Sequence, residues 1–489
     1  MNPMHGIPPL SSRLGFNAHN PSLGAVALKR DLSLFDLTNI VVGAVIGSDI
    51  YIASALTASL VGPFSVVLWV VSGIMALVLA MIFAYSAYYI PKVGGPFAYV
   101  SETFGDFWGF LAGWSMWIAE VISLPVFAIT FSNYLQYLVP LDTAEQLALK
   151  AAFLFGLTAV NIYGVRAAGR VNDVLTFIKL SPLLLLVVVG AGSFVLNPGF
   201  AANYSPLAPN GFGNVGTAIV LIFWAYVGFE MGTLPADEVR DPRRTIPRAI
   251  TMGMAVVALF YVSTNFIIFG AVSSAKLAGT AIPLILVGTA ILGAAGATMM
   301  SVGALFSVSG SDESGILGTA RLSYALSIDG LFPKAFAKVH RKYGTPYVAL
   351  LAQCIIAFIL SVFSGLSSLI SFSVLNLSFT FLLVSVSFLF LKKERGALHG
   401  QRVLPLLGIA VCLFLLFSTS LQDKLVGTII ILTGIPLYAY FSPKIDMADL
   451  KAEFLSTSKV TSRYLESTDR FLARLVKLVR SIVKRSSSR

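Results

Sequence analysis

The chain contains the stretch Gly43-Ala44-Val45-Ile46-Gly47-Ser48-Asp49-Ile50-Tyr51, which places two glycines, a serine and an aspartate inside an apolar run. The run is otherwise long enough to cross a bilayer, since about 20 apolar residues span the ~30 Å hydrocarbon core. A membrane helix opens only where its freed N–H and C=O groups find partners in protein or in a polar cavity. A glycine-broken span is therefore a candidate binding site, and a carboxylate at that depth is costly enough to indicate a function.

The composition of the whole chain indicates a membrane protein. Of 489 residues, 56% are hydrophobic and only 12% are charged, and the mean hydropathy is +0.84. This is too apolar for a soluble globule of this length. We therefore expect an all-α integral membrane protein with about twelve transmembrane helices. The expected spans are residues 34–61, 64–89, 107–138, 150–163, 174–196, 216–235, 250–269, 283–318, 347–363, 369–391, 403–418 and 425–441.

The distribution of basic residues predicts the orientation. Of the 34 Lys and Arg residues, Lys150, Lys276 and Lys424 fall in one set of loops, Lys179 falls within a span, and the others lie on the opposite side. Because basic loops stay on the cytoplasmic side, an even number of spans places both termini in the cytoplasm and the protein in the cell membrane. The net charge of +11 is then mostly topological, and no nucleic-acid partner is expected.

Two segments lie outside the expected spans at the ends of the chain. Residues 1–33 are expected to form a cytoplasmic N-terminal segment. Residues 442–489 form a basic tail in which apolar residues recur at near-helical spacing. Two interpretations fit this tail: an amphipathic helix lying on anionic lipid headgroups, or a solvated basic segment that reinforces the topology.

Two interruptions divide the chain into related halves. The first span is interrupted at residues 43–49, and the sixth span, five spans later, at Gly228-Phe229-Glu230. Paired interruptions in corresponding spans are typical of an inverted repeat whose site lies at the membrane midplane. We therefore predict a ten-helix transport core over residues 34–391, with halves 34–196 and 216–391, and two peripheral helices over residues 403–441.

Four motifs, in order along the chain, resemble those of the amino acid-polyamine-organocation (APC) superfamily, of the amino acid permease type. They are GSDIY at 47–51, PKVGGPFAY at 91–99, ADEVRDPRRTIPRAI at 236–250, and RLSYALSIDGLFPK at 321–334 followed by GTP at 344–346. The resemblance implies a LeuT-like five-plus-five inverted repeat with two extra helices. It also implies alternating access coupled to a proton gradient or, alternatively, a sodium gradient.

The resemblance further implies a substrate cradle made by the two broken spans. The first would present N–H groups to a substrate carboxylate and the sixth would present carbonyl groups to its amine, as the polarity of helix ends favours. Trp224 matches an aromatic position that closes over substrate in some relatives, although an aromatic in a membrane helix also serves packing. The candidate substrate-binding residues are Gly43, Ile46, Gly47, Ser48, Asp49, Trp224, Ala225, Tyr226, Gly228 and Glu230.

Lys179 is the candidate coupling residue, because it is the only base deep within an expected span. It matches the fifth-span lysine that replaces a sodium ion in proton-coupled relatives. A lysine at membrane depth can exchange a proton, whereas the alternative is a lysine that snorkels to the cytoplasmic interface.

Three acids are further candidates for the proton path. Asp312 and Glu313 are adjacent in the eighth span and point about 100° apart on a helix, so only one is expected to face Lys179. An Asp312–Lys179 pair would act as a proton-sensitive switch; alternatively, the acids bind a cation. Glu120 of the third span is a proton acceptor or a hydrogen-bond partner of a neighbouring helix.

Asp49 departs from the family motif, where a third glycine stands. An ionised carboxylate there would repel a substrate carboxylate. Either Asp49 is protonated in the loaded state, or the nearby end of the substrate is cationic. A third interpretation is that Asp49 turns away and caps a freed N–H group.

These observations predict a proton-coupled secondary transporter for amino acids or related amines. Five acids at membrane depth against one lysine would favour organic cations, so a polyamine or organic-cation carrier or exchanger is the alternative, followed by a non-transporting amino acid sensor. A channel would need a continuous pore, which two broken helices around a central site do not favour. No feature of the sequence favours one oligomeric state over another.

No enzyme is expected. The sequence has no metalloprotease, nucleophile-elbow or phosphate-loop motif, and its four histidines fall in termini or loops. Cys354 and Cys412 lie in apolar spans without metal-ligand spacing and are interpreted as core residues. We therefore expect no catalytic residue, no metal site and no cofactor other than the ion gradient.

Overall fold

The computed structural model describes residues 32–90, 95–163, 168–197, 199–233, 239–391 and 403–441. In these ranges the regular structure is helical apart from a single bridge between Leu32 and Val239, which confirms the all-α prediction. The N-terminal segment before Leu32 and the basic tail 442–489 lie outside the described residues. So do parts of two motifs, at 91–94 and 236–238.

Within the described ranges the helices follow the twelve expected spans. They are α1 (Leu34–Val45) with α2 (Asp49–Val61), α3 (Ser65–Tyr89), α5 (Asp106–Leu138), α6 (Thr143–Tyr163), α7 (Ala168–Leu196), α9 (Val215–Ala225) with η3 (Phe229–Thr233), α10 (Pro242–Ala271), α12 (Pro283–Ile328), α13 (Tyr347–Phe363), α14 (Leu366–Phe390), α15 (Val403–Ser418) and α16 (Leu421–Phe441). Short connecting helices are η2 (Gly62–Phe64), α4 (Pro96–Phe104), α8 (Gly199–Ala202), α11 (Ser274–Ala278) and η5 (Lys334–Ala337).

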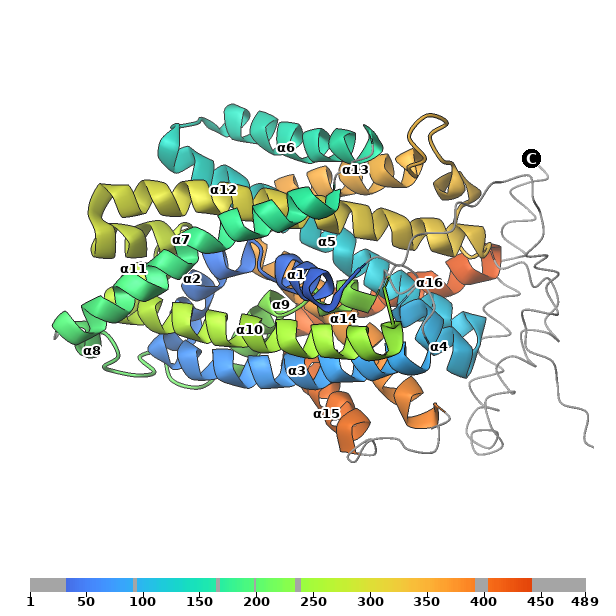
Figure 1. The fold of residues 1–489 in the computed structure, drawn as a ribbon, viewed down its shortest axis with the longest axis horizontal. Helices are drawn as coiled ribbons and strands as arrows, with labels where there is room; N and C mark the ends of the chain where they lie inside the picture. The colour runs from blue at the N-terminus through green and yellow to red at the C-terminus, as the bar shows by residue number, and fades with distance from the viewer. Residues whose placement is uncertain are drawn as a thin grey trace, which may run out of the picture.

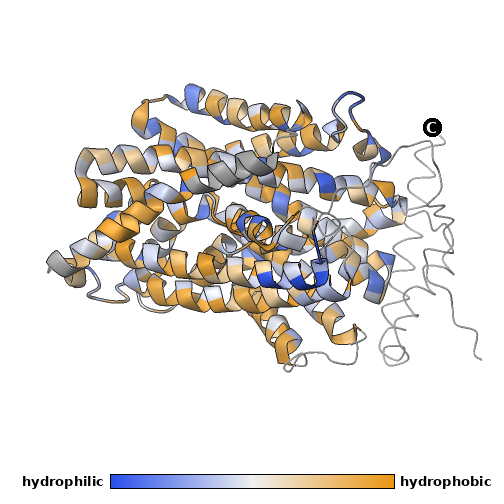
Figure 2. Ribbon diagram, in the orientation of Figure 1, coloured by the Kyte–Doolittle hydropathy of each residue, from blue (hydrophilic) through white to orange (hydrophobic). Residues whose placement is uncertain are grey.

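Length and composition agree with a membrane protein. Eight described helices are long and apolar enough to cross a bilayer, and four shorter helical stretches are also apolar. Figure 2 shows apolar residues along most of the helices, with hydrophilic residues gathered at the end of the bundle where α10 begins. The described helices thus have the apolar length and polar end that a bilayer requires.

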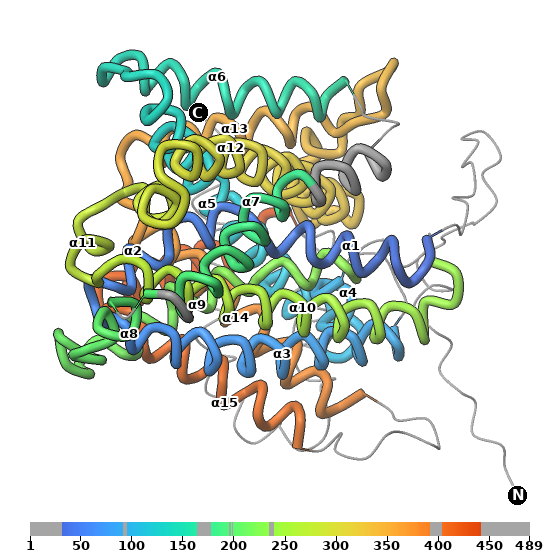
Figure 3. Tube along the Cα trace, turned by 60° about the vertical axis from the view of Figure 1, so that its left-hand side comes forward, coloured from blue at the N-terminus to red at the C-terminus, as the bar shows by residue number. Residues whose placement is uncertain are grey.

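The broken first span lies in the middle of the bundle. In Figure 1, α1 is surrounded by the other helices, and α6 and α15 lie at opposite edges, as they also do in Figure 3. α1 packs against α10, η3 and α7, while α5 packs against both α14 and α12. This arrangement buries both interrupted segments, so their polar backbone groups must find partners inside the protein.

The eighth span differs from its expected limits of 283–318. Gly293 has φ +65° and ψ −150°, and it interrupts α12. A Cβ atom on Gly288 would lie 2.5 Å from the carbonyl oxygen of Gly296, so the segment before Gly293 folds back on the segment after it. Gly288 and Gly296 allow this close approach because neither residue carries a side chain. The long part of α12 therefore runs from Gly293 to Ile328, ten residues beyond the expected end.

Candidate functional site: the two broken helices

The first break separates α1 from α2 over Ile46, Gly47 and Ser48. The chain is tightly packed there, because a Cβ atom on Gly47 would lie 3.0 Å from Ser311 Cβ and 3.1 Å from the ring of Phe127. Gly47 thus lets α12 and α5 approach the open backbone closely. The sequence predicted the position of this break from its glycines and Asp49.

Side chains from three other helices satisfy the carbonyl groups at the end of α1. The acceptors are four of five consecutive carbonyl groups, and the donors come from α7, α10 and α12. The contacts are Lys179 Nζ to Gly43 O at 2.5 Å, Tyr261 Oη to Val45 O at 3.0 Å, Ser311 Oγ to Ile46 O at 3.0 Å and Ser307 Oγ to Gly47 O at 3.3 Å. Because a helix end inside the membrane has no water to bond, these donors stabilise the open conformation.

The Asp49 carboxylate bonds to the protein on both sides. Its Oδ1 accepts the N–H of Gly47 at 2.7 Å, and its Oδ2 contacts the Tyr261 hydroxyl, whose single proton it shares with Val45 O. The side chain is buried, with 4% of its surface exposed. Asp49 therefore has the contacts of a cap on the freed N–H, one of the three interpretations that the sequence left open.

The second break follows α9 and touches the first. Gly228 has φ +116°, and a Cβ atom there would lie 3.0 Å from the carbonyl oxygen of Ala44. The N–H of Gly228 donates to Glu230 Oε2 at 3.1 Å, while Glu230 Oε1 is buried without a hydrogen-bond partner among the described residues. In both breaks an acid thus accepts the N–H of the glycine two residues before it.

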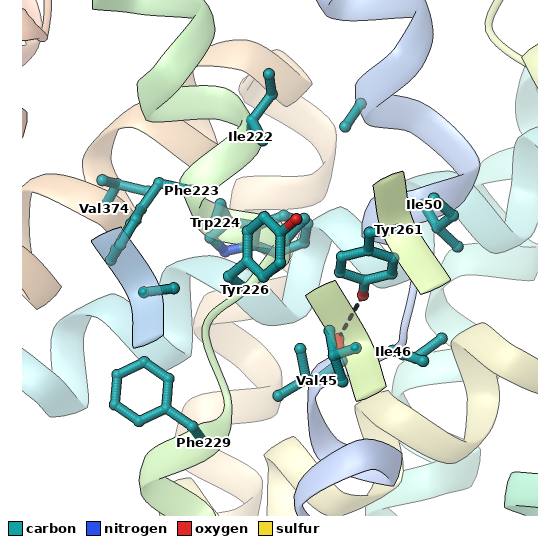
Figure 4. Close-up of a cluster of buried hydrophobic side chains, with 14 of the residues drawn as sticks. Val45, Ile46, Ile50, Ile222, Phe223, Trp224, Tyr226, Phe229, Tyr261 and Val374 are labelled. Carbon is teal, nitrogen blue, oxygen red and sulfur yellow. Dashed lines mark hydrogen bonds between the residues drawn. The ribbon is translucent and has the colours of Figure 1, made fainter. Parts of the chain in front are cut away.

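Aromatic side chains lie around the contact between the breaks (Figure 4). The Trp224 Nε1–H donates to Ser123 Oγ of α5 at 3.2 Å, and the rings of Tyr226 and Tyr261 are 5.3 Å apart. The Tyr226 hydroxyl donates to the carbonyl oxygen of Trp69 at 2.9 Å. Ala225, the last residue of α9, is buried with them. A role of Trp224 as a gate stays a prediction.

Lys179 reaches the first break and not the membrane surface. Its ammonium group bonds to Gly43 O and, at 3.2 Å, to Ser311 Oγ, and only 2% of the residue is exposed. The alternative of a snorkelling lysine is therefore wrong. Ser311 connects Lys179 to the first break, because its hydroxyl donates to Ile46 O. The ammonium group and this serine together hold the end of α1.

The expected pair of Asp312 with Lys179 is not formed. Both carboxylate oxygens of Asp312 are buried without a hydrogen-bond partner among the described residues. Asp312 is within electrostatic range of Cys354 of α13, whose thiol lies beside Thr158 of α6. The rotation of α12 turns Ser311 toward Lys179 and Asp312 toward α6 and α13, because adjacent helical residues point about 100° apart.

The remaining candidate acids divide between two places. Glu120 of α5 lies within electrostatic range of Glu230, so these two carboxylates belong to the region of the second break. Glu313 lies within electrostatic range of Arg321, about two turns further along the same helix α12. Their roles in proton movement stay predictions.

Replacing Ser311 by alanine tests this assignment. Ser311→Ala removes the acceptor for Lys179 and the donor to Ile46 O, and a hydrogen bond to a charged group contributes about 1.5–3 kcal/mol. Since 1.4 kcal/mol corresponds to a tenfold change, we expect uptake driven by an ion gradient to fall at least tenfold. Asp312→Asn, the adjacent control, should keep the gradient dependence of the wild type. Equal losses in both variants would contradict the assignment.

Sequence reasoning missed several residues of the site. Tyr261 stands in the seventh expected span, where no charged neighbour or motif marks it, and it bonds to Asp49, 212 positions away. Ser307 and Ser311 are four residues apart on α12, and this spacing would place both on one helix face. The serine pair could have indicated the face of α12 that contacts the first break. The adjacent acids, Asp312 and Glu313, were interpreted as the contact residues instead.

Comparisons with known proteins give a consistent result. The family profile described as "Amino acid permease" matches residues 32–435. A branched-chain amino acid permease of Bacillus subtilis is 29% identical over 449 residues, covering 86% of this chain and 95% of that protein. A methylthioribose transporter of the same species is 28% identical, covering 86% and 94%. The mouse large neutral amino acids transporter small subunit 2 is 31% identical, covering 85% and 81%.

Proposed function

Since this chain belongs to the amino acid permease family, and is thus a multi-pass membrane transporter and not an enzyme, we propose that it is a proton-coupled secondary transporter. It moves amino acids or related amines across the cytoplasmic membrane by alternating access, as a symporter. Its expected orientation, with both termini in the cytoplasm, follows from the basic loops.

The observation that carries proton coupling is the contact of Lys179 with the end of α1. Its ammonium group bonds to Gly43 O and Ser311 Oγ, which are oxygen atoms, the ligands that hard metal cations prefer. A fixed cation at these oxygens disfavours a second cation and supplies a dissociable proton. Loss of that proton would weaken both contacts, because hydrogen bonds from a neutral amine lack the charge assistance of an ammonium group, and would loosen α1 from α7 and α12. Lys179 can therefore link protonation to the conformation of the broken helix.

Alternating access is supported by the contact between the two breaks. Gly228 lies directly against Ala44 and Val45, so a shift of either broken helix must displace the other. Interrupted helices of this kind, lying around a central site, serve as the moving parts in transporters with inverted repeats. The substrate would bind where the two breaks meet, among Ser48, Trp224 and Glu230.

The substrate class is supported by the relatives and by the charge of the site. The named relatives carry branched-chain amino acids, large neutral amino acids and methylthioribose. A polyamine or organic-cation carrier is the second candidate, because Glu120 and Glu230 lie within electrostatic range of each other at the second break. When these carboxylates are ionised, a region of low dielectric constant around them concentrates cations.

The experiment is uptake into proteoliposomes with an imposed inside-alkaline pH gradient. Labelled leucine, arginine and putrescine are compared, and a sodium gradient of equal size replaces the pH gradient in a parallel set. We expect saturable uptake of at least one compound with the pH gradient and none with sodium alone. Uptake that needs sodium would overturn proton coupling, and unsaturable flux would indicate a channel.

A further inference from the structure

We infer that Asp49 occupies the anion-binding end of α2, so that the protein selects organic amines that lack a carboxylate. This inference rests on the proposed function and names its substrate class. α2 begins at Asp49, and the N-terminal end of a helix has the positive character that binds anions. The Asp49 carboxylate already accepts the N–H of Gly47 at 2.7 Å.

A residue of a second helix, α10, also holds the Asp49 carboxylate in place. The Tyr261 hydroxyl of α10 bonds to the other carboxylate oxygen and lies 3.0 Å from Val45 O. Tyr261 thereby connects the end of α1 to the start of α2. A substrate carboxylate would have to displace Asp49 from Gly47, break the Tyr261 contact, and then lie beside a like charge in a region that screens charge poorly.

The charges around the breaks leave a place for a cation. Lys179 and Asp49 are within electrostatic range of each other, so one positive and one negative group oppose each other at the first break. Glu120 and Glu230 remain at the second break. Glu230 Oε1 is buried and has no hydrogen-bond partner among the described residues, and a substrate ammonium group would supply one.

Most carbonyl groups of the first break already have donors, so they are a weaker place for the ammonium group than Glu230. Those of Gly43, Val45, Ile46 and Gly47 already accept hydrogen bonds from Lys179, Tyr261 and two serines of α12. The rings of Trp224, Tyr226 and Tyr261 lie near the contact between the breaks (Figure 4). These rings suit an alkyl chain that ends in an ammonium group.

The test compares leucine with isopentylamine, which is leucine without its carboxylate. Binding to purified full-length protein in detergent is measured by calorimetry, which needs no gradient. We expect the wild type to bind isopentylamine at least tenfold more tightly than leucine. Asp49→Gly frees the N–H of Gly47 and should improve leucine binding at least tenfold. Asp142→Asn, which removes one exposed negative charge and keeps a capping side chain, should leave both affinities unchanged.

Tighter binding of leucine than of isopentylamine by the wild type would overturn the inference, whatever the variant does. If Asp49→Gly does not fold, Asp49→Asn replaces it, since the amide keeps the size of the side chain but removes its charge. An unchanged preference in that folded variant would also overturn the inference. If the amine binds preferentially but no compound moves with a pH gradient, the proposed function fails and the assignment of Asp49 stands.

Discussion

Replacing Lys179 by methionine abolishes uptake driven by a pH gradient. Methionine is unbranched and one atom shorter than lysine, and it lacks the ammonium group that bonds to Gly43 O and Ser311 Oγ. Two hydrogen bonds to a charged group, at about 1.5–3 kcal/mol each, correspond to a loss of roughly 100-fold or more. Initial uptake rates in proteoliposomes measure this effect.

The matched control is Lys276→Met, which removes an exposed lysine from α11. It should transport as the wild type does. Exchange of labelled for unlabelled substrate without a gradient separates coupling from folding, and Lys179→Met should retain this exchange. Full gradient-driven uptake by the variant would exclude Lys179 from the coupling mechanism.

Replacing Gly228 by alanine destabilises the protein and prevents transport. The residue has φ +116°, a region that costs a residue with a Cβ atom about 1–2 kcal/mol. The added Cβ would also lie 3.0 Å from Ala44 O and 3.2 Å from Val45 Cα, and overpacking of this kind costs typically ~1–3 kcal/mol. We therefore expect a total loss of about 2–5 kcal/mol, seen as a lower unfolding temperature in detergent.

Gly344→Ala is the control that separates the two costs. Gly344 has φ +70°, but an added Cβ would meet no atom within 4 Å. It should therefore show only the conformational cost of about 1–2 kcal/mol and should keep its transport activity. Equal destabilisation in the two variants would show that the contact between the breaks contributes nothing measurable.

The sequence predicted the features that depend on local composition. Apolar runs of about 20 residues place the spans, because the thickness of the bilayer fixes their length. The acids Asp49 and Glu230, each two residues after a glycine, predicted both breaks, since a carboxylate is costly at membrane depth and glycines interrupt the paired helices of such transporters. The burial of Lys179 followed from its depth within the fifth span.

The sequence did not predict the contacts that depend on how each helix is rotated and tilted. Asp312 carries charge, so it was a stronger candidate partner for Lys179 than Ser311, yet the rotation of α12 selects the serine. The Tyr261 contact joins residues far apart in the chain. The fold-back at Gly293 depends on close packing with Gly288 and Gly296, and an apolar run does not encode such packing. These features follow from tertiary packing, which local patterns do not determine.

Substrate-driven proton movement tests the central claim most directly. The protein is reconstituted into vesicles that contain a trapped pH-sensitive dye, with no gradient imposed, and the best substrate of the uptake experiment is added outside. Proton-coupled symport predicts that the interior acidifies with the wild type and not with Lys179→Met. Entry of labelled substrate without any change in internal pH would contradict the account.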